Sequence, residues 1–196
     1  MISKVIVASN NKNKIREIKS KLVNLGIEVL SQREAGFDIE VEETGTTFEE
    51  NSMLKAKAIY ELAHQPVIAD DGGLEVDFLD GRPGVYSARF CGPDATDRDK
   101  YMKILEMMKD VDDEKRTARF RCVISYIDEN GEEHAFEGIC NGKIAYEPMG
   151  DNDFGYDPIF LVGDKSFAQI SEEEKNKISH RGKAVDKWVE YLSNEK

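Results

Sequence analysis

The chain has 196 residues and carries 27 basic against 39 acidic side chains, which gives a formal net charge of −12. A hydrophobic share of 40% is enough for a packed core and too high for a disordered chain. No apolar run approaches the roughly 20 residues of a membrane span. The acidic balance also argues against sequence-independent binding of nucleic acid, because that binding depends on Lys and Arg neutralising phosphates.

Cysteine usage and the N-terminal residues indicate where the chain works. Cys91, Cys122 and Cys140 show no CxxC spacing, so we expect reduced, buried thiols rather than disulfides or a zinc site. The first residues lack the apolar region and small-residue cleavage site of a secretory signal. We therefore expect a cytoplasmic protein with neither a nucleic-acid nor a membrane partner.

The first half of the chain alternates predicted strands and helices. Residues 5–8 are predicted to form a short buried strand, and a helix with apolar positions over 15–25 follows and ends at Gly26. The capping-box pattern from Thr47 to Glu50 predicts a second helix that continues to residue 62. Residues 67–69 are predicted to form a buried strand that stops at Asp70, and residues 74–78 alternate as a half-exposed strand.

The second half predicts a helix, a hairpin and a last helix. Thr96 can cap a helix with one apolar face, and residues 120–126 alternate towards the turn signal Asn130-Gly131. We expect a return strand over 136–140, a turn at 141–142, a strand over 159–162 and a final helix that buries Trp188. With no repeat or linker, the sequence predicts one domain over residues 1–196, of the α/β class, with a mixed sheet flanked by helices.

The first candidate for chemistry is the polar loop between the first strand and the first helix. A helix start offers backbone N–H groups and a positive dipole end, which suits a phosphate. The loop residues are Ser9, Asn10, Asn11, Lys12, Asn13 and Lys14. Because no Walker-type glycine pattern is present, an ordinary polar loop is the favoured interpretation on this segment alone.

The second candidate is the run Asp70-Asp71-Gly72-Gly73. Open α/β sheets bind ligands at the carboxyl ends of their strands, and two adjacent carboxylates suit a hard cation such as Mg²⁺. The glycines would let the backbone approach a ligand closely. A charged β-turn explains the same residues equally well.

Three further segments are ambiguous when taken alone. Glu43 could be another metal ligand and Lys55 could reach a phosphate, although acidic loops and helical lysines are common. The run from Phe154 through Gly155 and Tyr156 to Asp157 could stack a flat ring, or form a plain turn with two core aromatics. His180 and Arg181 stand at a helix N-terminus, where the dipole disfavours cations, and this indicates a purpose beyond helix stability. The other two histidines, His64 and His134, are interpreted as structural or exposed.

Taken together and in order, these segments resemble the inosine triphosphate pyrophosphatase family, whose bacterial members are XTP/dITP diphosphatases. The resemblance runs from the first strand to the last helix. It is carried by residues 9–11, Lys14, residues 43–45, Phe48, residues 50–51, 55–56, 69–71, 84–90, 154–160 and 178–182. Two departures stand out, because the family often has Thr-Gly-Asn where this chain has Ser9-Asn10-Asn11, and Ser where it has Gly72.

The resemblance implies a fold of two closely packed lobes with the active-site cleft between them. It also implies Mg²⁺-dependent, house-cleaning hydrolysis of the purine nucleotides ITP, dITP and XTP to the monophosphate and pyrophosphate, in a homodimer. By resemblance, Asp71 is the general base and, with Glu43, a metal ligand, while Lys14 and Lys55 neutralise the triphosphate.

The implied nucleotide contacts fall into two sets. Residues 9–14 and Gly72 would hold the phosphates, and the base would meet Phe154, Gly155, Tyr156, Asp157, Lys175, His180 and Arg181. Donors aimed at a 6-oxo group would accept hypoxanthine and xanthine and leave the amine of adenine facing a donor. Two alternatives remain: a pyrimidine-directed pyrophosphatase similar to Maf-type proteins, and a catalytically silent nucleotide-binding module.

Overall fold

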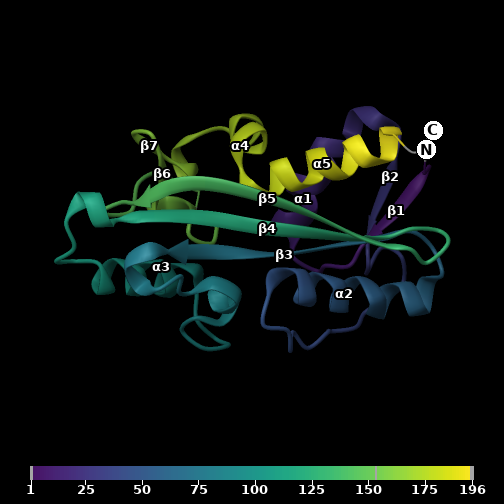
Figure 1. Ribbon diagram of the computed structural model, residues 1–196, viewed down its shortest axis with the longest axis horizontal. Helices are drawn as coiled ribbons and strands as arrows, with labels where there is room; N and C mark the ends of the chain where they lie inside the picture. Colours follow the sequence, from purple (N-terminus) through teal and green to yellow (C-terminus); the bar gives the residue numbers. More distant parts are fainter. Residues whose placement is uncertain (1, 153, 195–196) are drawn as a thin grey trace. The chain divides into compact units, whose positions relative to one another are not determined.

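The computed structural model describes residues 2–152 and 154–194, which form an α/β fold around one mixed sheet (Figure 1). The seven strands are hydrogen bonded in the order β2-β1-β3-β4-β5-β6-β7. Strand β1 runs parallel to β2 and β3, whereas β6 runs antiparallel to β5 and β7, so the predicted mixed sheet is confirmed. The strands are β1 (Lys4–Val7), β2 (Glu28–Ser31), β3 (Val67–Val76), β4 (Thr117–Ile127), β5 (Glu133–Ile144), β6 (Phe160–Val162) and β7 (Lys165–Ser166).

The helices are α1 (Lys12–Leu22), α2 (Phe48–Ala63), α3 (Asp97–Met107), α4 (Glu172–Ile178) and α5 (His180–Asn194). The chain divides into two compact units. The first unit comprises the residues up to 71, residues 122–138 and the residues from 180 on, and the second comprises residues 72–121 and 139–179. That residues 1–196 act as a single domain stays a prediction.

The first unit packs helices on both faces of its strands. Val5 and Val7 of β1 pack in one apolar cluster with α1 and α5, while Ile6 and Ala8 pack in another with α2. This alternation follows from the period of two along a strand. Helix α1 contacts α5, and Figure 1 shows α5 and α2 on opposite sides of β3.

The second unit has its own core. The predicted apolar face of α3 is buried there, with Tyr101 and Ile104 at most 1% exposed. Arg116 is also buried, because its guanidinium donates to four backbone carbonyl oxygens, those of Met108, Val111, Ile144 and Ala145. These hydrogen bonds offset the free-energy cost of burying the charged guanidinium.

Two predicted strand ends are wrong. Strand β3 does not stop at Asp70 but runs unbroken through Asp71, Gly72 and Gly73 to Val76. A Cβ at Gly73 would lie 2.3 Å from Ser87 Oγ, so this glycine permits close packing inside a strand rather than a turn. The turn predicted at 141–142 lies inside β5, where a Cβ on Gly142 would lie 2.2 Å from the carbonyl oxygen of Leu161.

Other predictions of local structure are confirmed or need only small changes. Thr47 and Thr96 both close capping boxes, and Gly26 ends the helical segment after α1 with a φ of 69°. Cys122 and Cys140 are buried free thiols as expected, whereas Cys91 is exposed. No helix in the described part of the chain has both the length and the apolar character needed to cross a bilayer.

Candidate active site

The loop after β1 forms a capped helix start. Asn11 is the N-cap of α1, and its Oδ1 accepts hydrogen bonds from the backbone N–H groups of Asn13 (3.0 Å) and Lys14 (3.2 Å). The backbone N–H of Asn11 donates in turn to Ser9 Oγ at 3.1 Å. Because these three N–H groups already have acceptors, an anion bound to those of Asn13 and Lys14 would have to replace Asn11 as the cap.

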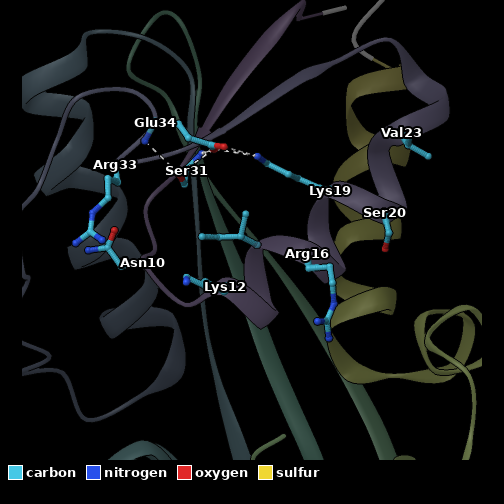
Figure 2. A pocket seen from close by; sticks show the side chains of 10 residues that line it. Asn10, Lys12, Arg16, Lys19, Ser20, Val23, Ser31, Arg33 and Glu34 are labelled. Atoms are coloured by element: carbon cyan, nitrogen blue, oxygen red, sulfur yellow. Dashed lines mark hydrogen bonds and ion pairs between the residues drawn. The ribbon is translucent and has the colours of Figure 1, made fainter. Parts of the chain in front are cut away.

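The side chains of the loop face different surroundings. Asn10 and Lys12 line a hollow of about 750 Å³ along the outer face of α1 (Figure 2). Arg16, Lys19 and Arg33 also line it, although Lys19 is paired with Glu34 at 2.8 Å and Arg33 with Asp38 at 2.9 Å. This surface is cationic in a chain of net charge −12, which favours the approach of an anion to the loop.

Lys14 contacts the first of the two adjacent aspartates on β3. Its Nζ lies 3.2 Å from Asp70 Oδ2, and both Nε and Nη2 of Arg181 lie 3.0 Å from the same oxygen. Arg181, in the first turn of α5, also donates through Nη1 to Glu17 of α1. Asp70, Arg181 and Glu17 are all at most 5% exposed, so the group is a buried network of alternating charges.

The charges around Asp70 keep it ionised. Burial alone would raise its pKa, but Lys14, Arg181 and Lys55 outweigh burial and hold the pKa of Asp70 well below its usual range. For Arg181, burial acts to lower the pKa, and the carboxylates of Asp70 and Glu17 overcome it and raise the pKa. Asp70 is thus fixed as an anion.

Asp71 has different partners because successive strand residues point to opposite faces. Lys55 of α2 donates from Nζ to Asp71 Oδ1 at 2.9 Å and to Glu43 Oε1 at 2.7 Å, so one ammonium group joins both carboxylates. The side chains of these three residues are 8–21% exposed. Strand β3 therefore distributes the two aspartates over two sets of cations instead of pairing them on one ion.

The pKa of Asp71 is shifted in the opposite direction from that of Asp70. Burial raises the pKa of Asp71 above its ordinary value, and Glu43 adds to this, although Lys55 and Lys14 oppose it. For Lys55, burial acts to lower the pKa, but Asp71, Asp70 and Glu43 raise it overall. The site combines a fixed ammonium ion with a carboxylate whose affinity for a proton is increased.

Two carboxylate oxygens in this region have no hydrogen-bond partner among the described residues, namely Asp70 Oδ1 and Asp71 Oδ2. A buried carboxylate oxygen without a donor is unfavourable, so a water, a cation or a ligand group is expected beside each. Oxygen ligands are those that Mg²⁺ prefers. The pair of Glu43 and the unpartnered oxygen of Asp71 therefore fits a hard divalent ion.

A different group of metal-type side chains lies in the β4–β5 hairpin. Asp128, Glu132 and His134 bring their ligand atoms within 4.8 Å of one another. Asp128 Oδ1 accepts from the backbone N–H groups of Asn130 and Glu132, and His134 packs against Tyr191, so these side chains organise the hairpin. That is the structural role expected for His134.

The aromatic run with Asp157 lies in the second unit. Lys175 of α4 donates to Asp157 Oδ2 at 2.5 Å, both residues are 3% exposed, and Lys175 Nζ lies 4.9 Å from the ring centre of Phe154. Tyr156 is buried and donates to the carbonyl oxygen of Ser87 at 2.8 Å. Gly155 has a φ of 58°, which favours glycine. The run is an ordered loop with a buried ion pair beside an aromatic face.

The structure thus brings the predicted residues together in two sets. The first unit gathers Lys14, Glu43, Lys55, Asp70, Asp71 and Arg181 into the contacts described above. The second unit gathers Phe154 and Asp157 with Lys175, and it also holds Gly72 and Gly155 and Tyr156. His180, in the first turn of α5, is 5% exposed.

Sequence reasoning gave no role to two further residues of the first unit. Glu17 stands beside Ile18 on the buried side of α1, so a charged residue next to a core position was the available signal. Asn51 is fully buried in α2, and its Oδ1 accepts from the backbone N–H of Gly45 at 2.8 Å. Asn51 directly follows the capping-box residue Glu50, and that sequence pattern does not indicate a bond to Gly45.

Comparison with known proteins identifies the group to which this arrangement belongs. Residues 5–191 match the model of the Ham1 family. The chain belongs to the Ham1 family. A solved Ham1 protein from Staphylococcus aureus is similar over 98% of this chain and 100% of its own, with 42% identity and a TM-score of 0.87. One from Coxiella burnetii is 39% identical, with a TM-score of 0.88, over 99% of this chain and 100% of its own.

Curated relatives of this Ham1-family chain carry a functional name. A protein of Bacillus subtilis named dITP/XTP pyrophosphatase is 46% identical over 98% of both chains. A protein of Escherichia coli with the same name is 45% identical over 98% of this chain and 100% of its own. The similarity covers both compact units and all the residues of the candidate site.

Proposed function

We propose that this Ham1-family enzyme hydrolyses the purine nucleotides dITP, XTP and ITP to the monophosphate and pyrophosphate, and so keeps them out of nucleic acids. The observation that carries the proposal is Lys55 joined to Glu43 and Asp71, with one buried oxygen of Asp71 left without a partner. Relatives that are 45–46% identical and named dITP/XTP pyrophosphatase support it.

Asp71 is proposed as the base that takes a proton from the attacking water. The unpartnered Oδ2 is the oxygen available to a water, while Oδ1 stays bonded to Lys55 at 2.9 Å. Burial raises the pKa of Asp71, whereas a cation held by the same carboxylate would lower it, so the case for the base rests on the position of Oδ2.

Positive charge for the triphosphate is proposed to come from Lys14 and Lys55, with Ser9 to Asn13 providing polar contacts. Phosphoryl transfer depends mainly on positioning and on charge stabilisation, and the two lysines are held in place by Asp70 and by Glu43 with Asp71. The cationic hollow beside Asn10 and Lys12 supports the approach of the polyanion.

Mg²⁺ is the proposed cofactor, held by Glu43 and Asp71. When bound, the ion would offset phosphate charge and polarise the scissile bond. The fit rests on the carboxylate oxygens that Glu43 and Asp71 offer side by side, the ligand type that Mg²⁺ prefers. Homodimer formation and a cytoplasmic location are proposed from the family resemblance.

Recognition of the purine is proposed for Phe154 to Asp157, Lys175, His180 and Arg181. The Lys175–Asp157 pair beside the Phe154 ring supports a polar edge next to a stacking face. Arg181 already donates to Asp70 and Glu17, so a base contact by Arg181 would be made in addition to its hold on Asp70. Lys175 is engaged with Asp157 in the same way, so His180 is proposed first as the donor to the 6-oxo group.

A nucleotide panel tests the proposed function. Purified protein is incubated with dITP, XTP, ITP, GTP, ATP and a pyrimidine triphosphate, with and without Mg²⁺, and pyrophosphate and orthophosphate are measured separately. We expect pyrophosphate from the first three nucleotides only, and only with Mg²⁺. Orthophosphate as first product would contradict the reaction, preference for the pyrimidine would support a Maf-type activity, and binding without turnover would support a silent nucleotide-binding module.

A further inference from the structure

The segment that carries Glu43 is held against the first turn of α2 by three consecutive backbone N–H groups. The N–H of Gly45 donates to Asn51 Oδ1 at 2.8 Å, and those of Thr46 and Thr47 donate to Glu50 Oε2 at 2.6 and 3.2 Å. We call residues 45–47 the strap. Glu43 lies two residues before the strap and reaches Lys55, one helical turn beyond Asn51.

Glu50 and Asn51 play different parts in holding the strap. Glu50 is exposed and completes an ordinary capping box with Thr47, which many helices have. Asn51 is fully buried and holds the strap residue nearest to Glu43. A side chain in that position does more than cap a helix.

The contact between Gly45 and Asn51 leaves no spare room. A Cβ on Gly45 would lie 2.7 Å from Asn51 Oδ1 and 2.6 Å from Glu50 Cβ, so only glycine allows the strap to lie so close to the helix. The Asn51 side chain therefore fixes both how close the strap lies to α2 and how its backbone N–H is oriented.

Only the oxygen of the Asn51 side-chain amide makes a hydrogen bond among the described residues. Its Nδ2 is buried without a hydrogen-bond partner among the described residues, which is unfavourable for a donor. An apolar side chain of similar size would avoid that unfavourable burial. The bond from Gly45 N–H to Oδ1 is thus the contribution that distinguishes asparagine at this position.

We propose that Asn51 is a positioning residue that acts through Gly45 to hold the Glu43 carboxylate beside Lys55 and Asp71, ready to bind a divalent cation. The inference rests on the proposed function, because it gives Glu43 the role of metal ligand. Outer contacts that orient a metal ligand change metal affinity by about 10- to 100-fold when they are removed.

Metal binding measured without nucleotide tests the inference directly. Mn²⁺ binding is followed by electron paramagnetic resonance for the wild type, Asn51→Ala and Gly45→Ala. Asn51→Ala removes the acceptor, whereas Gly45→Ala keeps it and pushes the strap away from the helix. We expect both variants to bind Mn²⁺ at least about tenfold more weakly. If Asn51→Ala does not fold, Gly45→Ala still decides the question.

The matched control is Ser52→Ala. Ser52 is the next residue of α2 and is equally buried. Its hydroxyl is bonded to Ser125 Oγ at 2.5 Å and to the carbonyl oxygen of Glu49 at 3.1 Å, and not to a strap residue. A general weakening of α2 would affect Ser52→Ala as much as Asn51→Ala. We expect Ser52→Ala to lower the thermal midpoint and to leave Mn²⁺ affinity within about twofold of the wild type.

A double-mutant cycle with Glu43→Gln shows whether Asn51 acts through Glu43. With the carboxylate already removed, Asn51→Ala should weaken Mn²⁺ binding no further. The inference is overturned if the two effects multiply, if Asn51→Ala binds Mn²⁺ as the wild type does, or if the wild type binds no Mn²⁺.

Kinetics separate this inference from the proposed function. Asn51→Ala should raise the Mg²⁺ concentration that gives half-maximal pyrophosphate release about tenfold, with KM for dITP at saturating Mg²⁺ little changed. If the wild type releases no pyrophosphate from any nucleotide, the proposed function fails, and the Mn²⁺ comparison still decides the role of Asn51.

Discussion

Asp70 and Asp71 are neighbours in sequence with separate chemical surroundings. The alternation of β3 directs Asp70 to Lys14 and Arg181 and Asp71 to Lys55 and Glu43. Asp70 has a lowered pKa and Asp71 a raised one. We infer that Asp70 fixes the surrounding cations, whereas Asp71 is the carboxylate able to exchange a proton.

Substitution of Asp70 is therefore expected to act mainly on stability. Asp70→Asn would leave the buried guanidinium of Arg181 with one carboxylate fewer, and breaking such a pair costs about 3–5 kcal/mol. Urea unfolding at neutral pH measures the free energy of unfolding. Asp77→Asn, at an exposed aspartate, is the control. A loss below about 1 kcal/mol, comparable to an exposed ion pair, would contradict the account of Asp70.

At the level of residues, sequence reasoning selected the charged side chains but not their pairing. The sequence predicts a turn at Asp70 and Asp71, because glycines usually follow the end of a strand. In the structure both lie within β3, where successive side chains point to opposite faces, so their separate partners were not predicted. Glu17 and Asn51 were missed because their partners, Arg181 and the Gly45 backbone, depend on contacts that no local pattern encodes.

At the level of elements, caps and apolar periodicity located the longer helices. Thr47 and Thr96 predicted the starts of α2 and α3, and these helices have buried faces that the sequence displays. Strand β2 and strand β7 were not predicted, because the one residue that each buries is a serine, Ser31 or Ser166, and so neither shows the buried apolar run that marks β1. Helix α4 was missed although Ser171 caps it, because its seven residues include five charged side chains.

The turn after β2 is held by one carboxylate. Glu34 accepts from Lys19 Nζ and from the backbone N–H and hydroxyl of Ser31, which lower its pKa from 4.5 to about 2. A lowered folded-state pKa stabilises the protein above the unfolded-state value of 4.5, and that stabilisation is lost as the pH falls towards 2.

The substitution Glu34→Gln tests the direction of this pH dependence. The wild type should exceed the variant in free energy of unfolding at pH 6, and the difference should shrink as the pH is lowered from 4.5 towards 2. Urea unfolding across that range measures it, with Glu40→Gln, at an exposed glutamate, as the control. A difference that stays constant or grows on acidification would show that Glu34 does not hold the turn in the way its contacts indicate.

At the level of the whole molecule, the chain must attract a polyanion despite a net charge of −12. Positive charge is concentrated in two places. Lys14 and Lys55 lie beside the two aspartates, and one hollow is lined by Lys12, Arg16, Lys19 and Arg33. Composition alone argued against sequence-independent binding of nucleic acid, but it could not indicate this concentration of charge. The ordered motifs indicated Lys14 and Lys55 through their resemblance to a family.

The central claim is that Asp71 activates the water that cleaves a purine triphosphate. Pyrophosphate release from dITP by Asp71→Asn tests it most directly, compared with the wild type at saturating Mg²⁺, with cooperative thermal unfolding showing that both are folded. The account predicts a fall in kcat of about 10²- to 10⁴-fold, the usual contribution of a general base. A folded Asp71→Asn enzyme with kcat within a few-fold of the wild type would contradict it.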